Sequence, residues 1–121
     1  MDKLIFVATL KQKYLNPLWL EKSEIRVYRS KGLLAHLLKR KHFIAAKYLD
    51  YLPDIIKSPD YAGISNNQIE LIKCFKDNIF ISIKLDANRR IYYVATLYEV
   101  SYSKIESYCK SGRLCRIKQD D

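Results

Sequence analysis

Asn78-Ile79-Phe80-Ile81-Ser82-Ile83-Lys84-Leu85-Asp86-Ala87-Asn88-Arg89-Arg90-Ile91-Tyr92-Tyr93-Val94-Ala95-Thr96-Leu97-Tyr98-Glu99 is the stretch that decides the fold. Its first half alternates Ile and Leu with other residues, which is the period-2 pattern of a β-strand with one buried face. Its second half is rich in Tyr, Val, Ile and Thr, which favour strands. Between them, Asp86-Ala87-Asn88-Arg89 contains the Asp and Asn that tolerate turn geometry. The stretch therefore predicts a β-hairpin whose apolar face needs further strands and helices to cover it.

The flanking segments supply further strands and helices. Three more strands are predicted at residues 4–11, ending before Asn16-Pro17, at residues 24–29 and at residues 68–75. Helices are predicted at residues 31–41 with Ser30 as N-cap, at 42–52, from Pro53 through 56, and at 102–111, capped by Ser101 or Ser103 and closed by Gly112.

Two stretches are expected to lack regular structure. Residues 58–63 have the composition of a loop, and residues 113–121 form a basic, then acidic, tail that is expected to be partly frayed. The order β-β-α-α-β-β-β-α predicts a single α+β domain over residues 1–121. We expect an antiparallel sheet of about four to five strands with helices packed on one face.

The charge balance restricts the choice of partners. The 121 residues include 22 Lys and Arg against 13 Asp and Glu, which gives a formal net charge of +9. Such an excess favours a nucleic acid, an acidic membrane surface or an acidic protein. Ten tyrosines suit base stacking, although Tyr is equally at home as an ordinary strand residue. The composition is that of a folded domain and argues against disorder, but it does not choose among these polyanions.

Cysteine usage and the N-terminal run bear on the compartment. Cys74, Cys109 and Cys115 are odd in number and show no CxxC spacing, which argues against a disulfide framework and against a zinc site. The apolar run Leu4-Ile5-Phe6-Val7-Ala8 is too short for a secretion signal or a membrane span. We therefore expect a soluble protein that acts in the cytosol without metal or cofactor, either alone or as the toxic module of a longer secreted protein.

The first candidate site is His36-Leu37-Leu38-Lys39-Arg40-Lys41-His42, where two imidazoles lie among three cations. Cleavage of RNA without a metal needs a base for the 2′-hydroxyl, an acid for the leaving 5′-oxygen and cations for the charge on phosphorus. The competing interpretation is a solvated basic helix face whose histidines are incidental. The two histidines are about 600° apart around a helix and do not share a face, so we expect only one to be catalytic.

The second candidate site is the polar face of the hairpin, and it depends on the turn. If the turn spans three residues, one face carries Ser82, Lys84, Tyr92, Val94, Thr96 and Tyr98. If it spans two, Thr96 moves to the Ile-rich face, and the sequence does not fix which register holds. A cation, hydroxyls and aromatic rings on one sheet surface suit a phosphodiester and a base. The alternative is that Thr96 and Tyr98 are ordinary strand residues.

Taken together, these segments resemble a known family. The run from His36 to His42, the helical Tyr48-Leu49-Asp50-Tyr51-Leu52-Pro53 and Ser58-Pro59-Asp60-Tyr61 resemble the histidine, helix and Pro-Asp signature of a phage and polymorphic-toxin nuclease group. Residues 76–85 and 92–98 are similar to its paired strands. This group is the phage division of the Barnase–EndoU–colicin–RelE (BECR) superfamily, and the resemblance covers residues 24 to 114.

The resemblance implies a metal-independent ribonuclease in which attack by the 2′-hydroxyl leaves a 2′,3′-cyclic phosphate, with tRNA or another structured RNA as substrate. It implies that His36 is the acid or base, that Thr96 and Tyr98 contact the scissile phosphate or ribose, and that Lys84 and Arg90 stabilise developing charge. The implied RNA-binding set is Arg26, Lys39, Arg40, His42 and Arg90. No Glu occupies the position that barnase-like members use as base, so the base is not identified.

Three functions follow from this sequence. The leading interpretation is an RNA-cleaving toxin or phage-borne nuclease that an acidic immunity or antitoxin protein holds in check. The alternatives are a non-catalytic RNA-binding module with the same basic face, and a phage protein whose basic surface binds a host protein.

Overall fold

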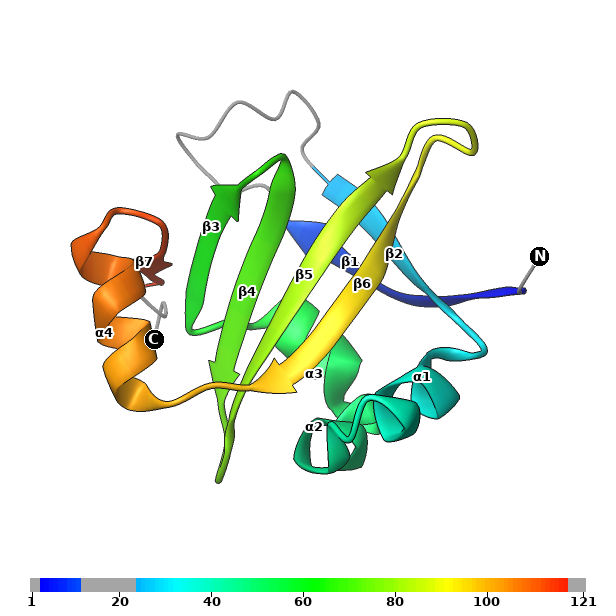
Figure 1. The fold of residues 1–121 in the computed structure, drawn as a ribbon. Helices are drawn as coiled ribbons and strands as arrows, with labels where there is room; N and C mark the ends of the chain where they lie inside the picture. Colours follow the sequence, from blue (N-terminus) through cyan, green and yellow to red (C-terminus); the bar gives the residue numbers. More distant parts are fainter. Residues whose placement is uncertain (1–2, 12–23, 118–121) are drawn as a thin grey trace.

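A seven-stranded sheet with helices against it forms the framework of the protein (Figure 1). The computed structural model describes residues 3–11 and 24–117. In chain order the described elements are β1 (Leu4–Lys11), β2 (Glu24–Ser30), α1 (Leu33–Lys39), α2 (Phe43–Lys47), the 3₁₀ turn η2 (Leu49–Tyr51), α3 (Leu52–Lys57), β3 (Tyr61–Ser65), β4 (Gln68–Cys74), β5 (Asn78–Asp86), β6 (Ile91–Glu99), α4 (Tyr102–Lys110) and β7 (Cys115–Arg116). Asn16-Pro17 and residues 118–121, for which predictions were made, lie outside the described residues.

The sheet is mixed and mostly antiparallel, so the α+β class is confirmed and the purely antiparallel sheet is wrong. Its strand order is β1-β2-β6-β5-β4-β3-β7, and β2 runs parallel to β6 over the pairs Val27–Tyr92 and Tyr28–Tyr93. The prediction of four to five strands is also wrong, because β3 and β7 were expected to be loop and tail. β3 pairs with β4 through a two-residue turn, Asn66-Asn67, in which both residues have positive φ, as hairpins of this length require.

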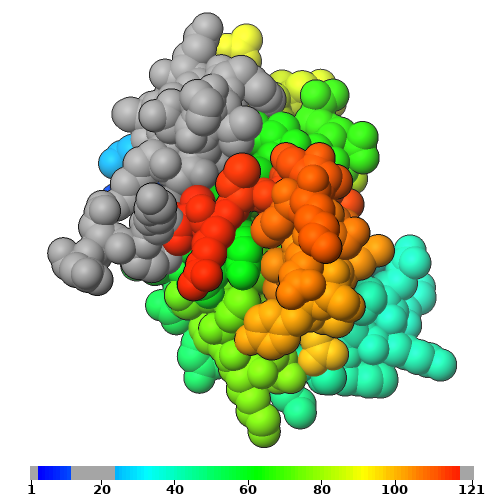
Figure 2. All heavy atoms as spheres, turned by 90° about the vertical axis from the view of Figure 1, so that its left-hand side faces the viewer, coloured from blue at the N-terminus to red at the C-terminus, as the bar shows by residue number. Residues whose placement is uncertain are grey.

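Helices cover both faces of the sheet, which corrects the prediction of one covered face. Consecutive residues of β5 point to opposite faces, and Ile81 packs in a core with α1, α2 and α3, whereas Phe80 packs with Ile105 of α4. We call these two surfaces the Ile81 face and the Phe80 face. In Figure 1 the three short helices lie together under one end of the sheet, and α4 lies apart from them. Figure 2 shows α4 and the segment after it lying over the β3–β4 side.

The register of the hairpin decides which side chains reach the Phe80 face. Asp86 pairs with Ile91, so the loop comprises residues 87–90, and the Asp86 carboxylate accepts hydrogen bonds from the backbone N–H groups of Asn88 and Arg89 at 3.1 and 3.2 Å. A β-bulge at Ala95 then adds one residue to β6.

Because of this bulge, the predicted polar face is partly wrong. Thr96 lies opposite Ser82 and Tyr98 opposite Phe80, as the three-residue turn would have placed them. Tyr93 rather than Tyr92 lies opposite Lys84. Tyr92 and Val94 point instead to the Ile81 face.

The helices are shorter than predicted at α1 and α2 and close to prediction at α4. Gly32 rather than Ser30 is the N-cap of α1, and the Ser30 hydroxyl accepts a hydrogen bond from the Gly32 N–H at 3.0 Å. Pro53 lies in the first turn of α3, as predicted. Ser101 caps α4 by accepting from the Lys104 N–H at 3.2 Å.

Residues 113–117, which follow α4, include β7 and are more regular than the tail that the sequence predicts for residues 113–121; residues 118–121 lie outside the described residues. Gly112 has a φ of 81°, and the backbone N–H groups of Gly112 and Arg113 donate to the carbonyls of Cys109 and Tyr108. This is a Schellman motif, the usual way for a helix to end at glycine. Arg113 then leads into β7, which pairs with β3.

Candidate functional site

Three rows of side chains cross the Phe80 face, with one residue from each successive strand. Neighbouring rows are about 7 Å apart, because each is two residues further along its strands. The first row contains Phe80 and Tyr98; the second contains Glu70, Ser82 and Thr96; the third contains Lys84, Tyr93, Tyr28 and Phe6. Thr96, Tyr98 and Lys84, three of the predicted site residues, therefore lie on one continuous surface.

The turn between α1 and α2 brings His42 to the end of the first row. The backbone N–H of Lys41 donates to Leu38 O at 3.1 Å, and that of His42 donates to Leu37 O at 2.8 Å. These two bonds form a second Schellman motif, in which Lys41 takes the left-handed position with a φ of 62°. Recorded pairing between β2 and β6 ends at Tyr93, and α2 packs against β6 beyond that point. His42 thus reaches Tyr98 at the end of β6.

The aromatic rings of the first row are stacked side by side. The Tyr98 ring lies 4.7 Å from Phe80 and 6.3 Å from the imidazole of His42, measured between ring centroids. Burial, followed by the nearby phenol of Tyr108, raises the pKa of Tyr98 to about 12. Tyr98 therefore keeps its proton at neutral pH and can donate a hydrogen bond, but it is a poor base.

His42 and Tyr98 also line a cavity of about 350 Å³ together with Lys41 and Glu99. Burial, and then a hydrogen bond and charge repulsion from Asp77, raise the pKa of the Glu99 carboxyl. An imidazole and a carboxyl with a raised pKa can exchange protons with a bound phosphodiester, and a neutral phenol can donate a hydrogen bond to it. Glu99 was not among the predicted site residues, although it ends the hairpin quoted above.

The second row is built around an ion pair that the sequence does not reveal. Arg113 donates two hydrogen bonds to the Glu70 carboxylate, from Nε at 2.7 Å and from a terminal nitrogen at 2.6 Å. The Glu70 side chain is 5% exposed and that of Arg113 is 32% exposed. The hydrogen bonds to Glu70 raise the pKa of the Arg113 guanidinium above its usual range. Both carboxylate oxygens are therefore engaged, and Glu70 holds Arg113 in place rather than offering a free base.

Gly63 explains how Arg113 reaches Glu70. A Cβ at Gly63 would overlap the carbonyl oxygen of Arg113, so the chain crosses β3 at the one residue that leaves room for it. The guanidinium lies 4.1 Å from the Tyr108 ring and 6.0 Å from the Phe80 ring, which extends the first row to a permanent cation.

Ser82 is the centre of the second row. The residue is 2% exposed, and its hydroxyl has no hydrogen-bond partner among the described residues. It lies between the Glu70 carboxylate and the Thr96 hydroxyl in the strand register. The polar groups on this face are thus a buried carboxylate, two hydroxyls and the flanking cations Arg113 and Lys84.

The structure separates four of the remaining predicted residues, namely His36, Lys39, Arg40 and Arg90, from this surface. His36, Lys39 and Arg40 are exposed on or next to α1, in the helix layer, and no recorded side-chain contact in residues 3–11 and 24–117 joins His36 to the sheet. Arg90 is exposed in the β5–β6 loop, eight strand residues and so roughly 26 Å from Tyr98. Arg26 lies on the Phe80 face beside the third row, with its guanidinium 4.9 Å from the Phe6 ring centroid.

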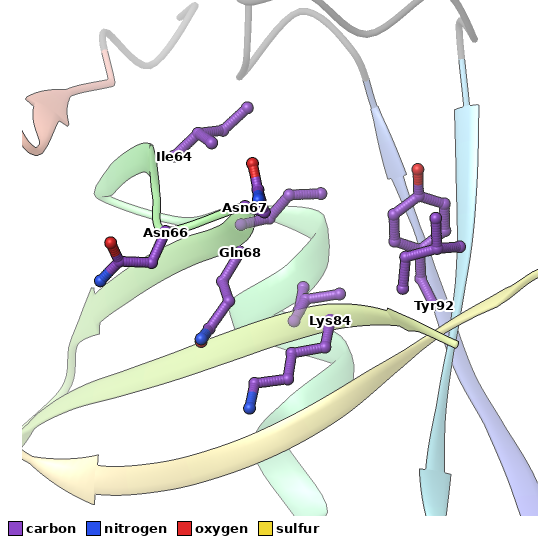
Figure 3. Close-up of a pocket in the computed structure, with 9 residues that line it drawn as sticks. Ile64, Asn66, Asn67, Gln68, Lys84 and Tyr92 are labelled. Carbon is purple, nitrogen blue, oxygen red and sulfur yellow. The ribbon is translucent and has the colours of Figure 1, made fainter. Parts of the chain in front are cut away.

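A larger cavity, of about 530 Å³, lies at the other end of the sheet beside the β3–β4 turn (Figure 3). Its lining is mainly apolar and includes Ile64, Ile69 and Tyr92. Figure 3 shows Gln68 and Lys84 extending to one side of the strands and Tyr92 to the other. Lys84 lines this cavity from the third row of the Phe80 face, whereas Thr96, Tyr98 and His42 are not part of the lining.

Membrane-spanning helices and clusters of metal ligands are both absent from residues 3–11 and 24–117. No helix there is both long and apolar enough to cross a membrane. Nor does that part of the chain bring together three or more His, Cys, Asp or Glu side chains that could hold a metal ion.

Comparison with protein families identifies the class of this domain. Residues 5–107 match the model of a family described as phage-Barnase-EndoU-ColicinE5/D-RelE like nuclease3 (PBECR3). The chain belongs to this phage BECR-like nuclease family, which confirms the resemblance drawn from the sequence. Comparisons with curated proteins and with solved structures gave no significant match.

Proposed function

We propose that this protein is an endoribonuclease that cuts RNA by attack of the 2′-hydroxyl on the adjacent phosphodiester, without a metal, and leaves a 2′,3′-cyclic phosphate. The observation that carries the proposal is the position of His42 beside Tyr98, on a basic sheet face in a chain that belongs to a nuclease family. The reaction needs a proton acceptor for the 2′-hydroxyl and a proton donor for the 5′-oxygen.

His42 is the histidine of the proposal, in place of His36. The sequence motif contains both histidines. Of these two, only His42 has a ring contact with Tyr98 in the part of the chain that the structure describes. In the proposed reaction His42 exchanges one proton, and Glu99, which lines the same cavity, exchanges the other. The pH–rate profile distinguishes which of these two residues accepts the proton of the 2′-hydroxyl.

The other groups stabilise charge without moving protons. Tyr98 donates its phenolic proton in a hydrogen bond to a non-bridging phosphate oxygen, and Thr96 binds the same phosphate or its ribose. Lys84 and Arg113 flank the Ser82–Thr96 pair and offset the charge that develops on phosphorus. The net charge of +9 supports RNA as the substrate and an acidic inhibitor protein as a second partner.

The test is to incubate the protein with total tRNA in EDTA and to analyse the fragment ends. We expect fragments with 2′,3′-cyclic phosphate ends, and a loss of roughly 10²–10⁴-fold in rate for His42→Ala. His36→Ala is the matched control and should cleave at the wild-type rate. Cleavage that survives His42→Ala but not His36→Ala would overturn the assignment.

The same experiment separates the competing functions. RNA that stays intact but shifts on a gel would show a non-catalytic RNA-binding module. An absence of RNA affinity at low salt would leave a protein-binding role for the basic surface.

A further inference from the structure

The third row of the Phe80 face carries an aromatic surface that the proposed reaction does not use. The Phe6 side chain on β1 is 45% exposed, although Phe6 lies in the middle of a strand. Its ring meets that of Tyr28 edge-on, with centroids 5.6 Å apart and planes at 69°. Exposure of a phenylalanine ring to water on a sheet surface costs free energy, and a molecule bound over the ring removes that cost.

The strand register extends this pair into a strip. Phe6 is opposite Tyr28, Tyr28 is opposite Tyr93, and Tyr93 is opposite Lys84. Three rings from β1, β2 and β6 thus lie in one line across the sheet, about 4.8 Å apart between strands, and the line ends at a cation. We call Phe6, Tyr28 and Tyr93 the aromatic strip.

Cations accompany the strip along its length. The Arg26 guanidinium lies 4.9 Å from the Phe6 ring centroid, and Lys84 is exposed at the opposite end. The Asp86 carboxylate, further along β5, is paired with Arg89 at 3.6 Å. Exposed rings interleaved with cations are the combination that binds single-stranded nucleic acid, because bases stack on the rings while phosphates meet the charges.

We propose that the aromatic strip is a binding subsite for unpaired RNA, which holds the bases next to the scissile phosphate. Thr96 is one row, about 7 Å, from Tyr93 and Lys84, so a strand that leaves the phosphate passes directly onto the strip. A ring can stack only on a base whose face is free, which excludes bases inside a duplex. The proposal rests on the proposed function for the position of the phosphate, and it makes loops or single strands the substrate.

The test measures binding without cleavage. The probe is a fluorescein-labelled single-stranded DNA of about ten nucleotides, which lacks the 2′-hydroxyl and is not cut, and its anisotropy is titrated at low salt with the full chain. We expect Phe6→Leu and Tyr28→Leu each to weaken binding by about tenfold or more, and Phe6→Tyr to retain it. Tyr102→Leu is the matched control, because Tyr102 is an aromatic residue 64% exposed on α4, away from the strip.

Two further measurements make the result specific. Arg26→Ala should reduce the slope of log affinity against log salt by about one phosphate contact. The same DNA annealed to its complement should bind more weakly than the single strand at equal salt. Thermal unfolding of each variant confirms that it is folded.

Each outcome either supports or overturns the proposal that the aromatic strip binds unpaired RNA. Wild-type affinity in both Phe6→Leu and Tyr28→Leu, or tighter binding of the duplex, would overturn it even if RNA is cleaved through His42. Ring-dependent binding by a protein that cleaves no RNA would support the strip and refute the proposed function instead.

Discussion

The ion pair between Glu70 and Arg113 offers the sharpest test of how the Phe80 face is held together. Arg113→Met keeps an aliphatic stem over Tyr108 but leaves the Glu70 carboxylate, 5% exposed, without its two donors. Removing one partner of a buried pair typically costs 3–5 kcal/mol, so we expect a loss of about 3–4 kcal/mol in the free energy of unfolding. Glu70→Gln should cost less, about 2 kcal/mol, because the Arg113 side chain is 32% exposed and water solvates the unpaired guanidinium.

The double variant Glu70→Leu/Arg113→Met distinguishes an ion pair from ordinary packing. It removes both charges together, and replacing a whole buried pair by apolar residues is often neutral. We therefore expect it to be more stable than Arg113→Met alone, and the cycle completed with the single variant Glu70→Leu should give a coupling free energy of about 2 kcal/mol.

Urea unfolding followed by circular dichroism measures these differences. For a chain of this length the Arg113→Met loss corresponds to a fall of about 10–15 °C in Tm. Costs that add without coupling, or a Glu70→Gln variant less stable than Arg113→Met, would refute the reasoning. The first result would mean that the two side chains act independently, and the second that the carboxylate is solvated after all.

Four further predictions concern the candidate site and the segments that position it. Lys41→Gly should raise the free energy of unfolding by up to about 1 kcal/mol in urea, because glycine adopts the left-handed φ of 62° without strain, and cleavage through His42 should persist. Gly63→Ala should lower the free energy of unfolding by about 3 kcal/mol and also lower the cleavage rate, because the new Cβ displaces Arg113. Thermal unfolding of the wild type and the variant measures the first effect, and the tRNA cleavage assay measures the second. Tyr98→Phe should lower kcat/KM about tenfold with no change in the pH–rate profile between pH 6 and 9, since the phenol, with a pKa of about 12, is protonated throughout that range. The raised pKa of Tyr98 also means that the wild type loses stability as pH rises from about 10 to 12, where the unfolded chain ionises this tyrosine first, and that Tyr98→Phe loses less.

The sequence predicts the elements whose signal is local. An apolar run predicts β1, and the alternating Ile-rich hairpin predicts β5 and β6, because successive strand residues point to opposite faces of the sheet. Ser101 predicts the start of α4 and Gly112 its end, since each satisfies backbone groups within a few residues of itself. These features depend on neighbours in the chain and can be deduced from it.

What the sequence does not predict depends on residues far away in the chain. Gly63 is typical of a loop, yet it lies in a central stretch of β3 because Arg113, fifty residues later, crosses over it. Glu70 has the pattern of an exposed strand position, and only its pairing with Arg113 makes its burial tolerable. The bulge at Ala95 leaves no compositional mark, although it decides that Thr96 and Tyr98 face the site.

The histidines show the same limit within the candidate site. Charge and spacing treat His36 and His42 alike, and the family resemblance led to the choice of His36. The difference arises from the Schellman motif at the end of α1, which turns the chain at Lys41 and carries His42 to Tyr98.

Arg113 has the same relation to the Schellman motif of α4, so the residues at both ends of the first row are the second residues after a helix C-cap. Backbone hydrogen bonds to the last helical turn fix both residues, and each side chain lies near a ring of the sheet, His42 near Tyr98 and Arg113 near Phe80. An imidazole and a guanidinium anchored in this way lose little freedom when a phosphate arrives, and such preorganisation is what transition-state stabilisation of a phosphodiester requires. The site therefore depends on two helix ends and a bulge more than on the basic helix face that first drew attention to His36.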